Sequence, residues 1–232
     1  MSRAEHLQEF YALLDELSDR VGGARVLGEC SARSGWPNRG VYFFFEEGEN
    51  RSGPDARPRV VRVGAHAVTA GSKTTLWRRL SQHKGVEKSG GGNHRGSVFR
   101  KLVGYALIEK DPTLLCSTWG HGSSAPREVR EAEHDLECLV SQHIRRMRVL
   151  WVAVDDAASP ASLRGLIERS AIGLLSNYNI PDDRIDEPSA QWLGRSCPRE
   201  RIQQSGLWNS DYVDEGYNPA FLEVLAALIR SM

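Results

Sequence analysis

Several common sequence features are missing from this chain, and each absence narrows the classes of protein to which it can belong. The four cysteines are scattered and form no C-x-x-C pair, so neither a zinc knuckle nor a disulfide framework is indicated. No apolar window approaches the length of a membrane span, and no basic segment leads into an apolar run near the first residue. We therefore expect a protein of the reducing cytoplasm that does not engage a membrane.

An excess of charge of one sign is also missing, because 30 basic residues balance 30 acidic ones. The charges are nevertheless unevenly distributed along the chain. Residues 73–105 carry eight basic side chains against the single acid Glu87, whereas residues 181–232 carry five basic against nine acidic side chains. This asymmetry favours one face that binds phosphates, and a merely solvated basic loop is the plainer alternative.

Two short apolar runs contain most of the information about the fold. Residues 40–45 (GVYFFF) and 60–64 (VVRVG) are rich in the aromatic and β-branched residues that strands favour. The connection between them, residues 46–58, is polar and contains glycine and proline. We interpret this pattern as a β-hairpin with a long, mobile loop.

We expect a helix after the hairpin, with an arginine and a histidine on the same face. Ser72 or Thr74 can cap it, and Arg79 and His83 lie four residues apart. Gly71-Ser72-Lys73-Thr74 resembles a phosphate-binding loop only superficially, because that loop needs a glycine directly before the lysine. We therefore do not expect a nucleotide hydrolase.

The remaining elements alternate between helices and strands. We expect helices over residues 2–21, 126–147, 159–176 and 218–229, a buried strand over 149–154, and a short strand over 103–108. Residues 85–104 contain three consecutive glycines and predict a flexible, cationic loop. Glu168 lies in the helix 159–176 on a line with Ile172 and Leu175, so its carboxylate needs an arginine, a metal ion or a raised pKa.

The order of these elements and residues resembles the GIY-YIG nuclease superfamily. Gly40-Val41-Tyr42 matches the first signature of that superfamily, and Arg62-Val63-Gly64 occupies the place of the second. Arg79 and His83 match the arginine and the following histidine of many members, and Glu168 matches the metal-binding glutamate. The resemblance covers roughly residues 38–180, with an insertion from about 85 to 147.

The chain departs from the family pattern at the second signature. Arg62 stands where the second tyrosine is expected, and the link between the two signatures is longer than usual. The longer link changes only a loop. Arg62 either supplies positive charge near the site in place of the tyrosine or is an ordinary surface residue on an edge strand.

The resemblance implies roles for individual residues. Tyr42 would orient or deprotonate the attacking water, although it also suits a core-facing aromatic run. Arg79 would pair with the phosphate, with Arg78 a poorer choice, and His83 would relay a proton. Glu168 would hold one Mg²⁺ or Mn²⁺ ion.

The resemblance also implies supporting roles for other residues. Asn179 or Asn177 would position the glutamate, and His66 would line the cleft. The basic insertion would follow a nucleic-acid backbone. Its proposed binding residues are Lys73, Lys84, Lys88, His94, Arg95, Arg100 and Lys101.

These observations predict an α/β (α+β) fold with a small, three-stranded mixed sheet of GIY-YIG type. We expect an N-terminal helix and linker over residues 1–37, a catalytic core over 38–180, and a helical extension over 181–232. The predicted function is metal-dependent cleavage of duplex DNA of the restriction or defence kind, because no helix-hairpin-helix or second nuclease module is visible. A homodimer would supply two active sites. The alternatives are an RNA-directed nuclease and a catalytically impaired nucleic-acid-binding module.

Overall fold

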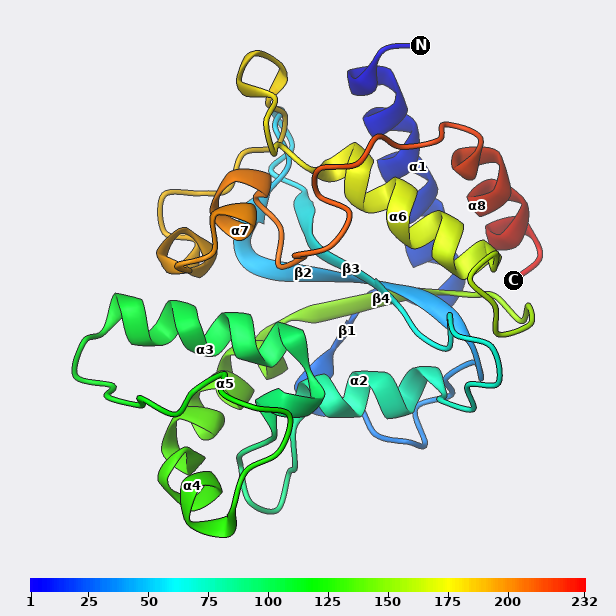
Figure 1. Cartoon of the computed structure of the whole chain (residues 1–232). Coiled ribbons are helices and arrows are strands. Elements are labelled where there is room, and N and C mark those ends of the chain that lie inside the picture. The colour runs from blue at the N-terminus through cyan, green and yellow to red at the C-terminus, as the bar shows by residue number, and fades with distance from the viewer.

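The computed structural model describes residues 1–232 and confirms the α+β class, with helices on both faces of a small sheet (Figure 1). The strands are β1 (Arg25–Val26), β2 (Gly40–Asn50), β3 (Pro58–Ala65) and β4 (Arg148–Ala153). The helices are α1 (Arg3–Val21), α2 (Leu76–Lys84), α3 (Val98–Lys110), α4 (Arg127–Ala132), α5 (His134–Arg146), α6 (Leu163–Leu175), α7 (Glu200–Ser205) and α8 (Phe221–Arg230). None of these helices combines the length and hydrophobicity needed to span a bilayer.

The sheet has the order β1-β4-β2-β3, and every neighbouring pair is antiparallel. The prediction of a mixed sheet of three strands is therefore corrected in two respects. The fourth strand, β1, has only two residues and is too short to be recognised from its sequence. β1 and β2 run in one direction and β3 and β4 in the other, and the order places strands of opposite direction next to each other, so no parallel pair forms.

Alternating residues of β2 serve two separate hydrophobic cores. Val41 and Phe43 face a layer made by α1, α6 and α8, whereas Tyr42 and Phe44 face α2, α3 and α5. The two layers lie above and below the sheet in Figure 1. Because both faces are covered, β2 is buried from Gly40 to Phe45 without the alternation of a half-exposed strand.

The helix ends largely follow the sequence signals. Ser2 and Glu5 form the predicted capping box of α1, and Gly22 ends that helix with φ +77°. Thr75, rather than Ser72 or Thr74, caps α2 by accepting a hydrogen bond from the Arg78 amide.

Three predicted elements differ from the observed ones. β2 continues to Asn50, so the hairpin loop is only residues 51–57. Residues 103–108 belong to helix α3, because Phe99, Leu102, Val103 and Ala106 place their buried side chains at helical spacing. The single helix expected over 126–147 is divided at Glu133 into α4 and α5.

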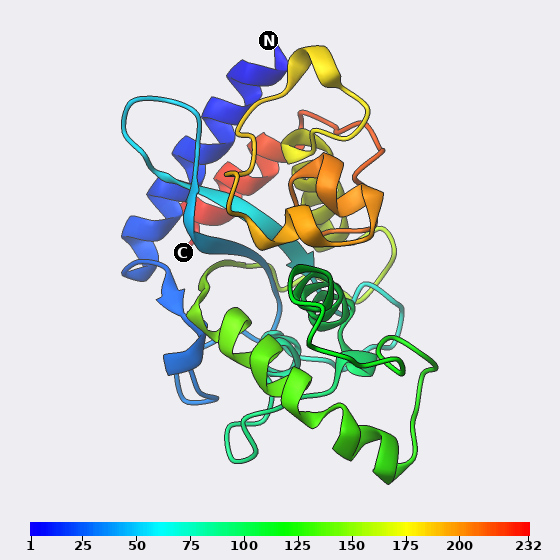
Figure 2. The same cartoon turned by 90° about the vertical axis from the view of Figure 1, so that its left-hand side faces the viewer.

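The C-terminal extension closes the outer edge of the sheet. The Trp208 amide donates to the Val61 carbonyl at 2.7 Å, and the Asn209 side chain bonds both the amide and the carbonyl of Val63 at 3.1 and 2.8 Å. In Figure 2 the segment before these residues arches beside β2 and β3. The extension therefore completes the core that carries the site.

Candidate active site

The two signature segments lie side by side in the neighbouring strands β2 and β3. Tyr42 and Gly64 are direct partners in the antiparallel register. A Cβ atom placed on Gly64 would lie 2.3 Å from both Cζ and the hydroxyl oxygen of Tyr42. Glycine is therefore required at this position, because the tyrosine ring lies directly over its backbone. The third residues of the two signature motifs are thus linked by packing.

The Tyr42 hydroxyl lies 2.9 Å from Nε2 of His83. Both side chains are fully buried, and the tyrosine belongs to the core around α2, α3 and α5. Tyr42 is therefore a core-facing aromatic and at the same time a hydrogen-bonding partner of the histidine. Because His83 projects from α2 toward the sheet, helix α2 positions its ring against the strand.

Nδ1 of His83 lies 2.8 Å from Oγ of Ser97, the residue that caps α3. Burial lowers the pKa of His83 well below its usual range, and the positive charges of Arg79, Arg62 and Arg100 lower it further. The imidazole is therefore neutral near pH 7, with one nitrogen available as a proton acceptor.

Arg62 is a buried residue and not a surface residue of the edge strand. Its guanidinium donates to the Trp208 carbonyl and lies 4.8 Å from the centroid of the Phe99 ring. Burial lowers the pKa of Arg62, and the nearby Tyr42 and Glu168 side chains act in the opposite direction. Its Nε–H has no partner in the structure. Arg62 thus places a positive charge near Tyr42, whose hydroxyl the imidazole contacts.

Glu168 reaches the same strand from α6. Its Oε1 accepts a hydrogen bond from the Ala65 amide at 2.8 Å, one residue beyond Gly64. The side chain is half-buried, and burial raises its pKa, while the Ala65 amide, Arg62 and Arg79 act in the opposite direction. It forms no ion pair with an arginine within 4 Å. The second oxygen of the carboxylate is free of protein hydrogen bonds.

Arg79 lies beside a shallow, open pocket of about 340 Å³ at the end of β3. The guanidinium contacts the Gln82 side chain at 3.1 Å and the Gly96 carbonyl at 3.4 Å, and the residue is partly exposed. The pocket is lined by Ala65, His66, Ala67, Thr74, Arg79, Gln82 and Gly96. A negatively charged group in this pocket would meet Arg79 directly.

His66 lines this pocket, but both of its ring nitrogens bond the backbone at the strand ends. Its Nε2 accepts a hydrogen bond from the Gly40 amide at 3.3 Å, and its Nδ1 donates to the Thr74 carbonyl at 2.9 Å. Burial lowers the pKa of His66 to about 4. Both nitrogens are used, so we assign His66 a structural role.

The two asparagines predicted to support Glu168 have other surroundings. The Asn177 side chain bonds the amide and the carbonyl of Ile185 at 3.0 and 2.8 Å, which fixes the start of the C-terminal extension. Asn179 is exposed and has φ +56°, beyond the end of α6. Neither forms a hydrogen bond with Glu168. Their predicted places in the site followed from the resemblance to the family pattern, and the structure gives Asn177 a different partner.

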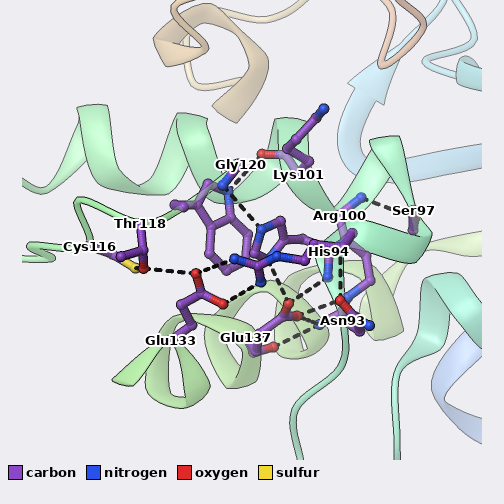
Figure 3. A network of polar contacts seen from close by, with 12 residues as sticks. Asn93, His94, Ser97, Arg100, Lys101, Cys116, Thr118, Gly120, Glu133 and Glu137 are labelled. Atoms are coloured by element: carbon purple, nitrogen blue, oxygen red, sulfur yellow. Dashed lines mark hydrogen bonds and ion pairs between the residues drawn. The ribbon is translucent and has the colours of Figure 1, made fainter. Parts of the chain in front are cut away.

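Four basic residues assigned to nucleic-acid binding are instead part of the protein interior. Lys84 is buried and donates to the Cys30 carbonyl at 2.7 Å. His94, Arg95 and Arg100 pair with acidic residues of the insertion (Figure 3). The prediction that these four contact a nucleic-acid backbone is wrong for the folded chain. Lys73 and Lys88 are exposed and Lys101 is partly exposed, so these three remain available.

The acidic partners come from α5 and the residue before it. Glu137 accepts hydrogen bonds from Arg100 and from both the amide and Nδ1 of His94, at 2.6 and 3.0 Å for the histidine. Glu133 binds Arg95 through two nitrogens, at 2.5 and 2.8 Å. Figure 3 shows the side chains converging between α3 and α5. The expected cationic loop is thus a neutralised, buried network.

The three-glycine segment makes this network possible through close packing. A Cβ atom on Gly92 would lie 2.2 Å from Cζ of Arg100, and one on Gly91 would lie 2.9 Å from the His134 ring. The expectation of a flexible loop does not describe these glycines. They let the backbone pass directly over the arginine, a role that a run of glycines in the sequence does not distinguish from a loose loop.

Ser97, Trp208 and Asn209 contribute to the site and were not predicted from the sequence. Ser97 contacts His83, Trp208 holds Arg62, and Asn209 holds the backbone of β3 beside Gly64. A serine before a helical pattern signals a cap, but nothing in the sequence indicates its second partner. The contacts of Trp208 and Asn209 join positions 146 residues apart, so no local pattern contains them.

The side chains around Glu168 can hold a metal ion only if the ion takes few of its ligands from the protein. No group of three or more histidine, cysteine, aspartate or glutamate side chains is arranged to hold an ion. Glu168 is a single carboxylate with one free oxygen, and its hydrogen-bond partner Ala65 lines the open pocket. Mg²⁺ usually keeps several waters and is bound through one or two carboxylates. The site therefore fits an ion that remains largely hydrated.

Comparison with known families agrees with this geometry. A family model described as the GIY-YIG domain matches residues 1–232. The chain belongs to the GIY-YIG domain family. The predicted membership of the GIY-YIG nuclease superfamily is thereby confirmed, and the match includes both the insertion and the C-terminal extension. No curated protein and no solved structure matches the chain significantly.

Proposed function

We propose that this GIY-YIG protein is a divalent-metal-dependent nuclease that hydrolyses phosphodiester bonds, with duplex DNA as its substrate. The observation that carries the proposal is the contact of the Tyr42 hydroxyl with neutral His83, together with the nearby positive charge of Arg62. Glu168, anchored at Ala65, brings a carboxylate to the same strand. A restriction or defence role is the form of this activity that we favour.

In this proposal, Tyr42 and His83 handle the proton of the attacking water. The Tyr42 hydroxyl transfers its proton to Nε2 of His83, and the resulting phenolate takes a proton from water. Arg62 stabilises the phenolate by its charge. The hydroxyl is buried in the structure, so this step requires a movement of the protein that admits water to it.

Arg79 and Arg62 would neutralise the charge that develops on the phosphate oxygens. Two guanidinium groups near one phosphate supply donors in a fixed geometry, and such preorganised charge is a major source of rate enhancement. A phosphodiester anion next to them also offsets the positive field that disfavours protonated His83. Substrate binding would thus make the histidine a better base.

Glu168 would hold a Mg²⁺ or Mn²⁺ ion through its free oxygen. When bound, such an ion supplies positive charge that stabilises the leaving oxygen of the scissile bond. Burial raises the pKa of Glu168, and Arg62 and Arg79 oppose this shift without forming an ion pair with the carboxylate. A divalent ion is the kind of partner that this carboxylate lacks.

The test is an assay with supercoiled plasmid, single-stranded DNA and RNA as parallel substrates, with Mg²⁺, Mn²⁺ or EDTA. We expect nicking or cleavage of the plasmid with either metal and none with EDTA. Cleavage of RNA alone would keep the chemistry and change the substrate. Salt-sensitive DNA binding without cleavage in any metal would instead support a binding module on an inactive nuclease fold, which the covered Tyr42 hydroxyl would then explain.

The pH dependence of cleavage should depend on Glu168. Because burial raises the pKa of this carboxyl, the metal-binding form is lost at a higher pH than for an ordinary glutamate. Protons and metal ions compete for the carboxylate, so raising the Mg²⁺ concentration should move the acid limb of the pH–rate profile to lower pH. His83 stays neutral through this range. An acid limb that does not move with Mg²⁺ would contradict the assignment.

A further inference from the structure

The insertion forms a hydrogen bond with the ring of His83 through one buried hydroxyl. Ser97 is 1 % exposed, and its Oγ lies 2.8 Å from Nδ1 of His83. The same oxygen accepts a hydrogen bond from the Arg100 amide at 3.3 Å as the N-cap of α3. Arg100 in turn donates to the His83 carbonyl at 2.9 Å. The first turn of α3 therefore holds both the backbone and the ring of this histidine.

The hydrogen positions follow from the partners of His83. Neutral His83 has a single acceptor nitrogen, so only one of the two buried hydroxyls that contact its ring, those of Tyr42 and Ser97, can donate to it. The phenol is the more acidic of the two and therefore the stronger hydrogen-bond donor, and Nε2 of His83 is the acceptor within its reach. If Nε2 carried hydrogen instead, the stronger donor, the fully buried phenolic O–H, would be left without a partner, which is the costlier of the two arrangements.

This assignment places the hydrogen of neutral His83 on Nδ1, where it is donated to Ser97. We propose that Ser97 is a positioning residue that holds His83 in the tautomer with hydrogen on Nδ1, so that Nε2 can receive the proton of Tyr42. The catalytic consequence rests on the proposed nuclease function, whereas the tautomer does not. The inserted segment, through Ser97, becomes part of the proton-transfer machinery of the site.

The decisive measurement is nitrogen-15 NMR of the His83 ring in the whole protein, which reports the nitrogen that carries hydrogen. We expect Nδ1–H in the wild type and in Ser97→Thr, and loss of this preference in Ser97→Ala. The wild-type spectrum tests the proposal even if a variant fails to fold. Hydrogen on Nε2 in the wild type, or an unchanged tautomer in folded Ser97→Ala, would overturn it.

Cleavage kinetics test the consequence separately. Ser97→Ala should lower the cleavage rate by about tenfold or more, within the range that general acid–base groups contribute, and Ser97→Thr should restore it. Ser2→Ala is the matched control, because it removes the N-cap hydroxyl of α1, which packs on the opposite face of the sheet from His83. Equal rates for Ser97→Ala and Ser2→Ala would show that Ser97 acts only as a helix cap. A wild type without cleavage would refute the proposed function but leave the NMR result standing.

Discussion

Replacement of Glu168 by glutamine should lower the rate of metal-dependent cleavage by roughly a hundred- to a thousandfold while the protein stays folded. The amide oxygen of the introduced glutamine can still accept the Ala65 hydrogen bond, so the position of α6 on β3 is kept. Only the negative charge that would hold the ion is removed. The measurement is the rate of plasmid cleavage at saturating Mg²⁺, with Glu223→Gln on the exposed side of α8 as control.

The same substitution should leave thermal stability unchanged or raise it. Because burial raises the pKa of Glu168 in the folded protein, the folded state holds this proton more tightly than the unfolded state. Stability from this group is thus greatest at low pH and is lost as pH rises through the folded-state pKa. A neutral side chain avoids that loss at pH 7. Undiminished cleavage by Glu168→Gln would contradict the assignment of Glu168 as the residue that holds the metal ion.

Replacement of Glu137 by alanine should cost about 3–5 kcal/mol of unfolding free energy, the range for a buried ion pair that loses one partner. Glu137 is 4 % exposed, and the Arg100 side chain that it neutralises is fully buried. Its loss leaves a guanidinium without its counter-ion and leaves the His94 amide without its acceptor. Chemical denaturation followed by circular dichroism measures the change.

Glu131→Ala is a suitable comparison for this experiment. Glu131 also pairs with an arginine, Arg127, but both side chains are largely exposed. Exposed ion pairs contribute about 0–1 kcal/mol, so the control should unfold close to the wild type. A small effect of Glu137→Ala, similar to that of the control, would mean that the network in Figure 3 does not hold the insertion together.

The candidate site was predictable where its residues belong to local patterns. Tyr42 and Gly64 lie in short β-rich runs, and Arg79 and His83 share a helix face, so their approximate placement follows from strand and helix periodicity. Glu168 was recognisable because a carboxylate on an apolar helix line requires an unusual environment. That environment is now visible as the Ala65 hydrogen bond and a raised pKa.

The role of the basic insertion was not predictable from its charges. Counting residues 73–105 alone indicates an excess of positive charge, but the acids that bond His94, Arg95 and Arg100 lie 37 to 43 residues further along the chain. Glu133 and Glu137, four apart, could have suggested an acidic helix face opposite the arginines. The net charge of one stretch of sequence therefore does not predict a binding surface when another helix supplies the compensating charge.

The segment that covers β3 also limits how two copies of this protein can associate. Trp208 and Asn209 already bond the outer side of β3 from Val61 to Val63, and the opposite edge of the sheet is the two-residue strand β1. Strand-by-strand addition needs a free row of amides and carbonyls, and neither edge offers a long one. A homodimer of this protein would therefore have to form through helices or loops and not through a continuous intermolecular sheet.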